Sequence, residues 1–157
     1  MEIKSIDEKN RARINAFITA HWFTLEMAVH GEIIDLGTAD GLYTENAGEI
    51  TGLITFRIIG SELEILSLDS IYERQGVGTA LVDRVIGYSK NNKIKRIKVI
   101  TTNDDLNAVG FYQKRGFDMA ALYRNAADEA RKLKPEIPLI GMGGIPIRHE
   151  IELEMIL

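Results

Sequence analysis

The chain contains no cysteine among its 157 residues. This absence excludes disulfides, thiolate catalysis and cysteine-bound metals, and it fits a reducing compartment. No apolar run approaches the roughly 18 residues that a membrane-spanning helix needs. Residues 1–8 also lack the apolar core of a signal peptide. We therefore expect a cytoplasmic protein with no membrane partner.

Basic residues are in slight deficit, with 19 Lys and Arg against 23 Asp and Glu and a net charge of −4. A nucleic-acid-binding protein usually carries a basic surface, so this balance argues against a nucleic-acid partner. The histidines His21, His30 and His149 are scattered, so no metal site is expected. A hydrophobic content of 45% and the chain length predict one domain over residues 1–157.

Hydrophobic periodicity predicts a mixture of strands and helices. The expected strands are Leu42–Asn46, Glu49–Ile59, Glu62–Leu68, Ile94–Thr102, Phe117–Leu122 and His149–Leu157. The expected helices run from a cap at Asp7 to about Ala20, from the glycine loop to Asn91, over Leu106–Arg115 and over Asn125–Lys132, with Ile14, Phe17 and Ile18 on the buried face of the first. For Leu25–Val29 and Glu32–Leu36 the pattern leaves strand and loop equally open.

The loop Glu73–Thr79 contains two glycines and lies between an alternating strand and a helix. The first N–H groups of a helix have no partner within it, and the helix dipole favours an anion there. A phosphate-binding loop is therefore one interpretation, and a glycine-rich loop without a ligand is the other. The P-loop pattern fails because Thr79-Ala80 replaces its Lys-Ser/Thr pair, and the dinucleotide pattern fails at Leu81.

A second motif, Asn107-Ala-Val-Gly-Phe-Tyr-Gln-Lys-Arg-Gly-Phe117, follows the next strand. Together with Arg74-Gln-Gly-Val-Gly-Thr79, it closely resembles the GNAT superfamily of acyl-CoA-dependent N-acetyltransferases. The resemblance implies an α/β (α+β) fold with a mixed, mostly antiparallel central sheet, splayed at its middle and flanked by helices. Two features depart from the family pattern: Glu73, and an insertion at Tyr123–Ile147.

The resemblance also implies acetyl-CoA as co-substrate and a set of residues that bind it. The implied pyrophosphate loop consists of Arg74, Gln75, Gly76, Val77, Gly78 and Thr79. The backbones of Leu66, Ser67 and Leu68 are expected to hold the thioester and the pantetheine arm, with the Leu66 N–H nearest the acetyl oxygen. Asn107 is the candidate for the pantetheine amides, and Asn103 is a second candidate.

Three side chains are candidates for the chemistry. Tyr112 matches the family's tyrosine that protonates the CoA thiolate; the alternative is a core aromatic residue. Glu62 and Glu64 are both candidate general bases, because a period of two puts them on one strand face with Leu66 and Leu68. An amine that is already partly neutral needs neither. Trp22 either packs against an acceptor or anchors its loop.

These residues predict an N-acetyltransferase that moves the acetyl group of acetyl-CoA directly to a primary amine of a small molecule or peptide. The alternative is a non-catalytic acyl-CoA sensor. A dinucleotide-dependent oxidoreductase is disfavoured by Leu81. The insertion is expected to cover the acceptor entrance or to form part of a homodimer contact, because loops of this length often serve such functions.

Overall fold

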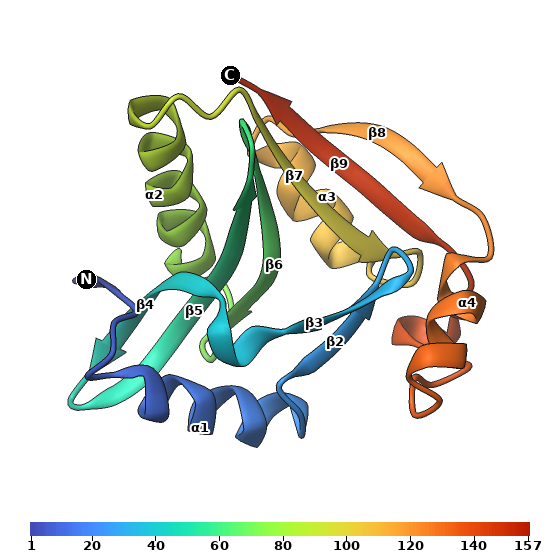
Figure 1. Ribbon diagram of the computed structural model, residues 1–157, viewed down its shortest axis with the longest axis horizontal. Coiled ribbons are helices and arrows are strands. Elements are labelled where there is room, and N and C mark those ends of the chain that lie inside the picture. The colour runs from blue at the N-terminus through green and yellow to red at the C-terminus, as the bar shows by residue number, and fades with distance from the viewer. The chain divides into compact units, whose positions relative to one another are not determined.

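The computed structural model describes residues 1–157, and the chain forms two compact units (Figure 1). The first unit comprises Met1–Leu25, Asp35–Ile97 and Leu157, and the second comprises Glu26–Ile34 and Lys98–Ile156. In chain order the strands and helices are β1 (Ile3–Ser5), α1 (Arg11–Trp22), β2 (Glu26–Val29), β3 (Glu32–Asp35), β4 (Asp40–Asn46), β5 (Glu49–Ile59), β6 (Glu62–Ser70), α2 (Val77–Asn91), β7 (Arg96–Thr102), α3 (Leu106–Lys114), β8 (Asp118–Tyr123), α4 (Ala126–Leu133) and β9 (Glu150–Ile156), with short 3-10 turns at Leu36–Thr38 and Met142–Gly144. The prediction of mixed α/β structure with mostly antiparallel pairing is confirmed, whereas the single domain and the central splay stay predictions.

The first unit contains an antiparallel sheet in the order β1-β4-β5-β6. The three strands predicted between residues 42 and 68 are confirmed as β4, β5 and β6, which pair as an antiparallel meander. Strand β1 was not predicted, because three residues are too few to show a periodic pattern. Helix α2 packs on β5 and β6 (Figure 1), and its Leu81, Val82 and Val85 are completely buried. Burial of such side chains contributes roughly 1.5–3 kcal/mol each.

Helix α1 begins at Arg11, so the predicted start near Asp7 is wrong. The Asp7 carboxylate accepts N–H bonds from Lys9 and Asn10 at 2.8 and 3.0 Å, and it therefore closes a turn before the helix. Phe17, predicted to be buried, is half-buried and lies against the ring of His21, with 4.2 Å between centroids. Ile14 and Ile18 alone form the fully buried stripe of α1, because the apolar pattern of this helix is narrow.

The second unit contains three strands in the order β7-β9-β8, together with α3, α4 and the small sheet β2–β3. The structure therefore resolves the ambiguity at residues 25–36 in favour of a hairpin. Local chemistry defines both ends of α3: the Asp105 side chain accepts the N–H of Ala108 at 3.0 Å, and Gly116 is left-handed with φ +96°.

The insertion at residues 123–147 is an ordered segment built around Arg131. The guanidinium of Arg131 donates to the carbonyls of Ile137, Pro138 and Ile147 at 3.2, 2.6 and 2.5 Å. It also pairs with Asp128 at 2.7 Å. One planar side chain therefore holds three points of the loop, which suits the fixed fork geometry of arginine.

None of the helices combines the length and the apolar character that a membrane span requires.

Candidate active site

Strand β6 carries a β-bulge at Leu66, the first residue of the segment predicted to hold the thioester. Thr55 of β5 pairs with Ser67, and the next residue, Phe56, pairs with Ile65, so Leu66 has no partner on β5. A bulge of this kind breaks the ladder locally and bends its strand, and such bulges occur often next to active sites. The structure thus places an irregular backbone at the residue whose N–H was predicted to lie nearest the acetyl oxygen.

The bulge changes which side chains share a face of β6. Residues of β5 that are two apart point to one side, and their partners on β6 follow. Pairing therefore puts Glu62, Glu64, Ser67 and Asp69 on one face. Leu68 lies on the opposite face, so the predicted common face of the two glutamates and Leu68 is wrong. The reason is the one extra residue, which reverses the alternation.

Each of the two candidate bases has an arginine partner. Glu64 is almost completely buried and accepts a bond from Arg57 Nε at 2.7 Å. Glu62 is more exposed and lies 3.4 Å from Arg96 Nη1. Ser67 also has a partner on this face, because its hydroxyl lies 2.6 Å from that of Thr55. The glutamates are therefore constrained side chains, and the choice between them as bases stays a prediction.

The glycine loop is exposed and turns through two left-handed residues. Arg74 has φ +62° and Gly76 has φ +77°, and no side chain caps the start of α2. Alternating backbone handedness of this kind can turn successive N–H groups toward one concavity that suits an anion. A Cβ at Gly76 would meet open space, so crowding does not explain the glycine. Its positive φ does, because glycine adopts this conformation without strain.

Gly52 of β5 allows the first turn of α2 to approach the sheet closely. A Cβ at this position would overlap Val77 and would lie 2.9 Å from the Thr44 hydroxyl and 3.2 Å from Leu81. Val77, the first residue of α2, is buried. The position of the glycine loop therefore depends on Gly52 of β5, which lies outside the Arg74–Thr79 motif.

In the second unit, Tyr112 lies on α3 within a group of three aromatic rings. Its ring is edge-on to Phe111 and Phe117, with centroids 5.2 and 5.3 Å apart, and its side chain is 4% exposed. Asn107, in the first turn of α3, is exposed and has no side-chain hydrogen bond. It is therefore available to a ligand, and its role as a pantetheine contact stays a prediction.

Asn103 is engaged by its own unit. Its side-chain oxygen accepts the N–H groups of Arg148 and His149 at 2.9 Å each, and its amide nitrogen donates to the Pro146 carbonyl at 3.0 Å. The end of the insertion is thus fastened to the end of β7. This arrangement gives Asn103 a structural task, and its role as a second pantetheine contact stays a prediction.

Sequence patterns did not reveal the pair formed by Trp22 and Asp69. The indole Nε1 donates to both carboxylate oxygens of Asp69 at 3.1 Å. Burial raises the pKa of this carboxyl, while the Trp22 bond and the nearby His21 lower it in part. A single aspartate before the glycine loop gives no periodic signal. The bulge brings Asp69 onto the face of Glu62 and Glu64, and the end of α1 brings Trp22 to it.

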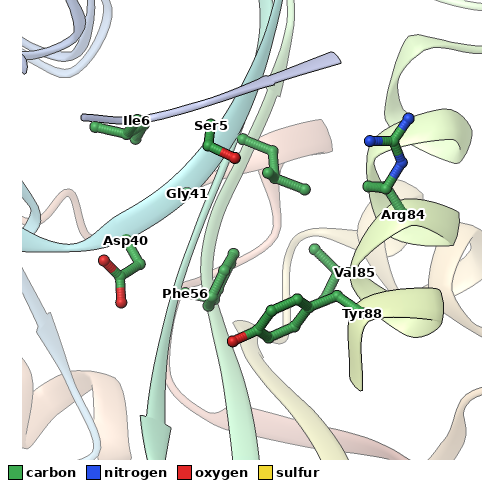
Figure 2. Close-up of a pocket in the computed structure, with 9 residues that line it drawn as sticks. Ser5, Ile6, Asp40, Gly41, Phe56, Arg84, Val85 and Tyr88 are labelled. Atoms are coloured by element: carbon green, nitrogen blue, oxygen red, sulfur yellow. The ribbon is translucent and has the colours of Figure 1, made fainter. Parts of the chain in front are cut away.

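A pocket of about 370 Å³ lies elsewhere in the first unit, on the α2 side of the sheet (Figure 2). Phe56 and Val85 form its apolar lining, and the polar groups of Asp40, Arg84 and Tyr88 stand at an exposed rim (Figure 2). No predicted site residue lines this pocket. No cluster of three or more His, Asp or Glu side chains that could hold a metal is present in the structure.

Comparison with known sequences establishes the family. The model of the acetyltransferase (GNAT) family matches residues 10–117, more than half of the chain. The uncharacterized protein YdhI of Bacillus subtilis (strain 168) is 49% identical over 136 residues, which are 86% of this chain and 85% of that protein. YxbD of the same organism is 43% identical over 141 residues, 89% of each chain. The chain therefore belongs to the acetyltransferase (GNAT) family, as its two motifs predicted.

Solved structures show the same fold. A GNAT family acetyltransferase from Elizabethkingia anophelis with acetyl-CoA bound is 25% identical to this chain. The superposition covers 78% of each chain and has a TM-score of 0.66. A Bacillus subtilis acetyltransferase in complex with CoA is 18% identical, covers 99% of this chain and 98% of its own, and has a TM-score of 0.72. The predicted GNAT fold class is confirmed.

Proposed function

We propose that this acetyltransferase moves the acetyl group of acetyl-CoA directly to a primary amine of a small molecule or peptide. The observation that carries the proposal is the sequence of features in the first unit: a bulge at Leu66, a loop with left-handed Arg74 and Gly76, and the uncapped start of α2. An irregular strand followed by an anion-favouring loop suits a ligand with a thioester at one end and phosphates further along. The acetyl-CoA and CoA bound by the two solved relatives support this co-substrate.

The proposed transfer is direct and forms no covalent enzyme intermediate; the chain has no cysteine that could be acylated. The nitrogen lone pair of the neutral amine attacks the thioester carbonyl, a C–N bond forms and the C–S bond breaks. Backbone N–H groups near Leu66 would stabilise the charge that develops on the carbonyl oxygen. The thiolate of CoA takes a proton from Tyr112, and the amine nitrogen gives up one proton to a base or to water.

The cofactor site is tested by calorimetry with acetyl-CoA on the wild type and Gly78→Glu. The new carboxylate would stand in the loop where the pyrophosphate is proposed, so we expect acetyl-CoA binding to be lost. Gly87→Glu is the matched control, because it adds the same charge on α2 at a position where a Cβ meets open space. Equal affinity in wild type and Gly78→Glu would show that the phosphate site is misplaced.

Turnover separates the enzyme from an acyl-CoA sensor. Release of the CoA thiol is followed with a panel of primary amines, and the enzyme is expected to release thiol in proportion to N-acetyl product. A protein that binds acetyl-CoA tightly and releases thiol with no amine of the panel would instead fit the sensor. A fall in thermal stability on adding acetyl-CoA would contradict both, because a ligand of the folded state raises the melting temperature.

A further inference from the structure

We propose that Asp69 and Trp22 form the acceptor site, which binds the ammonium group of an aromatic monoamine and transfers one of its protons to the Asp69 carboxylate. This inference rests on the proposed function, because it takes the thioester to lie at Leu66–Leu68. The geometric basis is the indole N–H that donates to both Asp69 oxygens at 3.1 Å. This bond fixes the carboxylate between the end of α1 and the end of β6.

Asp69 lies on the correct face of the strand for this role. It shares its face with Ser67, and the two are two residues apart, about 7 Å along a strand. An aspartate side chain and a bound ammonium group can span that distance to the proposed thioester. The opposite face of the sheet is covered by α2 through Gly52 and Val77. The acceptor is therefore expected on the face that carries the Trp22–Asp69 bond, opposite α2.

The charges on this face leave one carboxylate without a cationic side chain bound to it. Glu64 pairs with Arg57, and Glu62 pairs with Arg96. The hydrogen bonds of Asp69 come from Trp22 alone, and no lysine or arginine forms an ion pair with it. A partly buried carboxylate with no counter-ion is costly unless a cation binds it. One free carboxylate matches one ammonium group, so a monoamine fits better than a polyamine.

The surroundings of Asp69 also suit proton transfer. Burial raises its pKa, and the groups that oppose this shift are the Trp22 N–H and the charge of His21. Glu64, on the same strand as Asp69, is held by Arg57. The residue opposite Asp69 on β5 is the apolar Leu53. A carboxylate with a raised pKa is a stronger base toward an ammonium group. The proton moves from the amine nitrogen to an Asp69 oxygen, and the neutral amine then attacks the thioester.

Exposed aromatic side chains close in sequence to this pair indicate the rest of the acceptor. Trp22 is 50% exposed although its N–H is bonded, the adjacent Phe23 is 89% exposed, and Tyr72 lies three residues beyond Asp69 and is 48% exposed. Aromatic faces attract both ammonium groups and other rings. We therefore expect an arylalkylamine rather than an aliphatic one.

The test compares tyramine, which has one ammonium group and a ring, with spermidine, which has several ammonium groups and no ring. Thiol release from acetyl-CoA should give a higher kcat/KM with tyramine. Asp69→Asn can still accept the Trp22 bond but cannot take a proton, so kcat/KM for tyramine should fall about 100-fold. Asp83→Asn removes an exposed carboxylate of α2 and is the matched control. A preference for spermidine, or no turnover of tyramine, would overturn the proposal.

The pH profile separates proton transfer from simple packing. In wild type, kcat/KM should fall as the pH drops through the pKa of Asp69, because the protonated form cannot bind ammonium. Trp22→Phe removes a bond that lowers this pKa, so the acid limb should move to higher pH. Asp69→Asn should lose that limb. An acid limb that is the same in all three proteins assigns the pH dependence to another group and overturns the role of Asp69.

Calorimetry with acetyl-CoA distinguishes failure here from failure of the proposed function. If wild type and Asp69→Asn bind acetyl-CoA equally and the variant also acetylates tyramine normally, only the acceptor site is wrong. If wild type does not bind acetyl-CoA, the proposed function itself is wrong.

Discussion

Tyr112 shows how one residue can serve both packing and chemistry. Its ring lies edge-on to Phe111 and Phe117, which holds the side chain in one orientation on α3. Tyr112→Phe keeps these ring contacts and removes only the hydroxyl. If the hydroxyl protonates the CoA thiolate, kcat should fall about 100-fold, the lower end for lost general-acid catalysis, while the affinity for acetyl-CoA changes little. Steady-state kinetics with an acetylated amine, together with calorimetry, measure both effects.

Melting temperature is the control for this variant. A loss of packing would lower the stability of Tyr112→Phe as well as its activity, whereas loss of the acid alone would leave the melting temperature close to that of wild type. Wild-type kcat across the pH range would assign Tyr112 to the hydrophobic core.

Single residues also mark the limit of what sequence patterns can predict. A cap at Asp104 or Asp105 and a left-handed Gly116 follow from local chemistry that the neighbouring residues define, and the structure has Asp105 as the cap. The bulge at Leu66 was not, because an extra residue in a strand changes no composition and breaks no turn rule. Its effect was to place Ser67 and Asp69 on the face of Glu62 and Glu64 and to move Leu68 to the other face.

At the scale of elements, the contact of α2 with β5 determines where the glycine loop begins. Gly52→Ala would drive a methyl group into Val77 and against the Thr44 hydroxyl. Overpacking of this kind costs about 1–3 kcal/mol, and it should also displace the first turn of α2 and weaken acetyl-CoA binding. Urea unfolding and calorimetry measure the two effects.

Gly87→Ala is the matched control for this prediction. A Cβ at Gly87 meets open space in the middle of α2, so alanine should raise stability by up to about 1 kcal/mol through helix propensity. If Gly52→Ala has wild-type stability and wild-type affinity, the close approach of α2 to β5 is not required for the loop.

Element types followed from periodicity where the pattern was long. Strands β5 and β6 and helix α2 appear within a residue or two of their predicted bounds. The start of α1 was misplaced, because an aspartate that closes a turn and one that caps a helix have the same sequence context. The hairpin β2–β3 was left open, since strands of four residues show too few alternations to identify.

At the scale of the whole molecule, the insertion carries a group of exposed apolar side chains. Leu139, Ile140 and Met142 are all more than half exposed, on a segment that Arg131 holds in one conformation. An ordered segment that exposes apolar side chains is typical of a partner or ligand contact. The two predicted roles, a cover over the acceptor entrance and a homodimer contact, both use such a surface.

A triple variant, Leu139→Ser with Ile140→Ser and Met142→Ser, distinguishes these roles without removing the Arg131 bonds. If the segment is a dimer contact, sedimentation should shift to a smaller species while KM for the amine is unchanged. If it covers the acceptor entrance, KM for the amine should change while sedimentation does not. The affinity for acetyl-CoA should stay at the wild-type value in either case, because no residue proposed to bind it is altered. Unchanged sedimentation and unchanged KM together would contradict both roles.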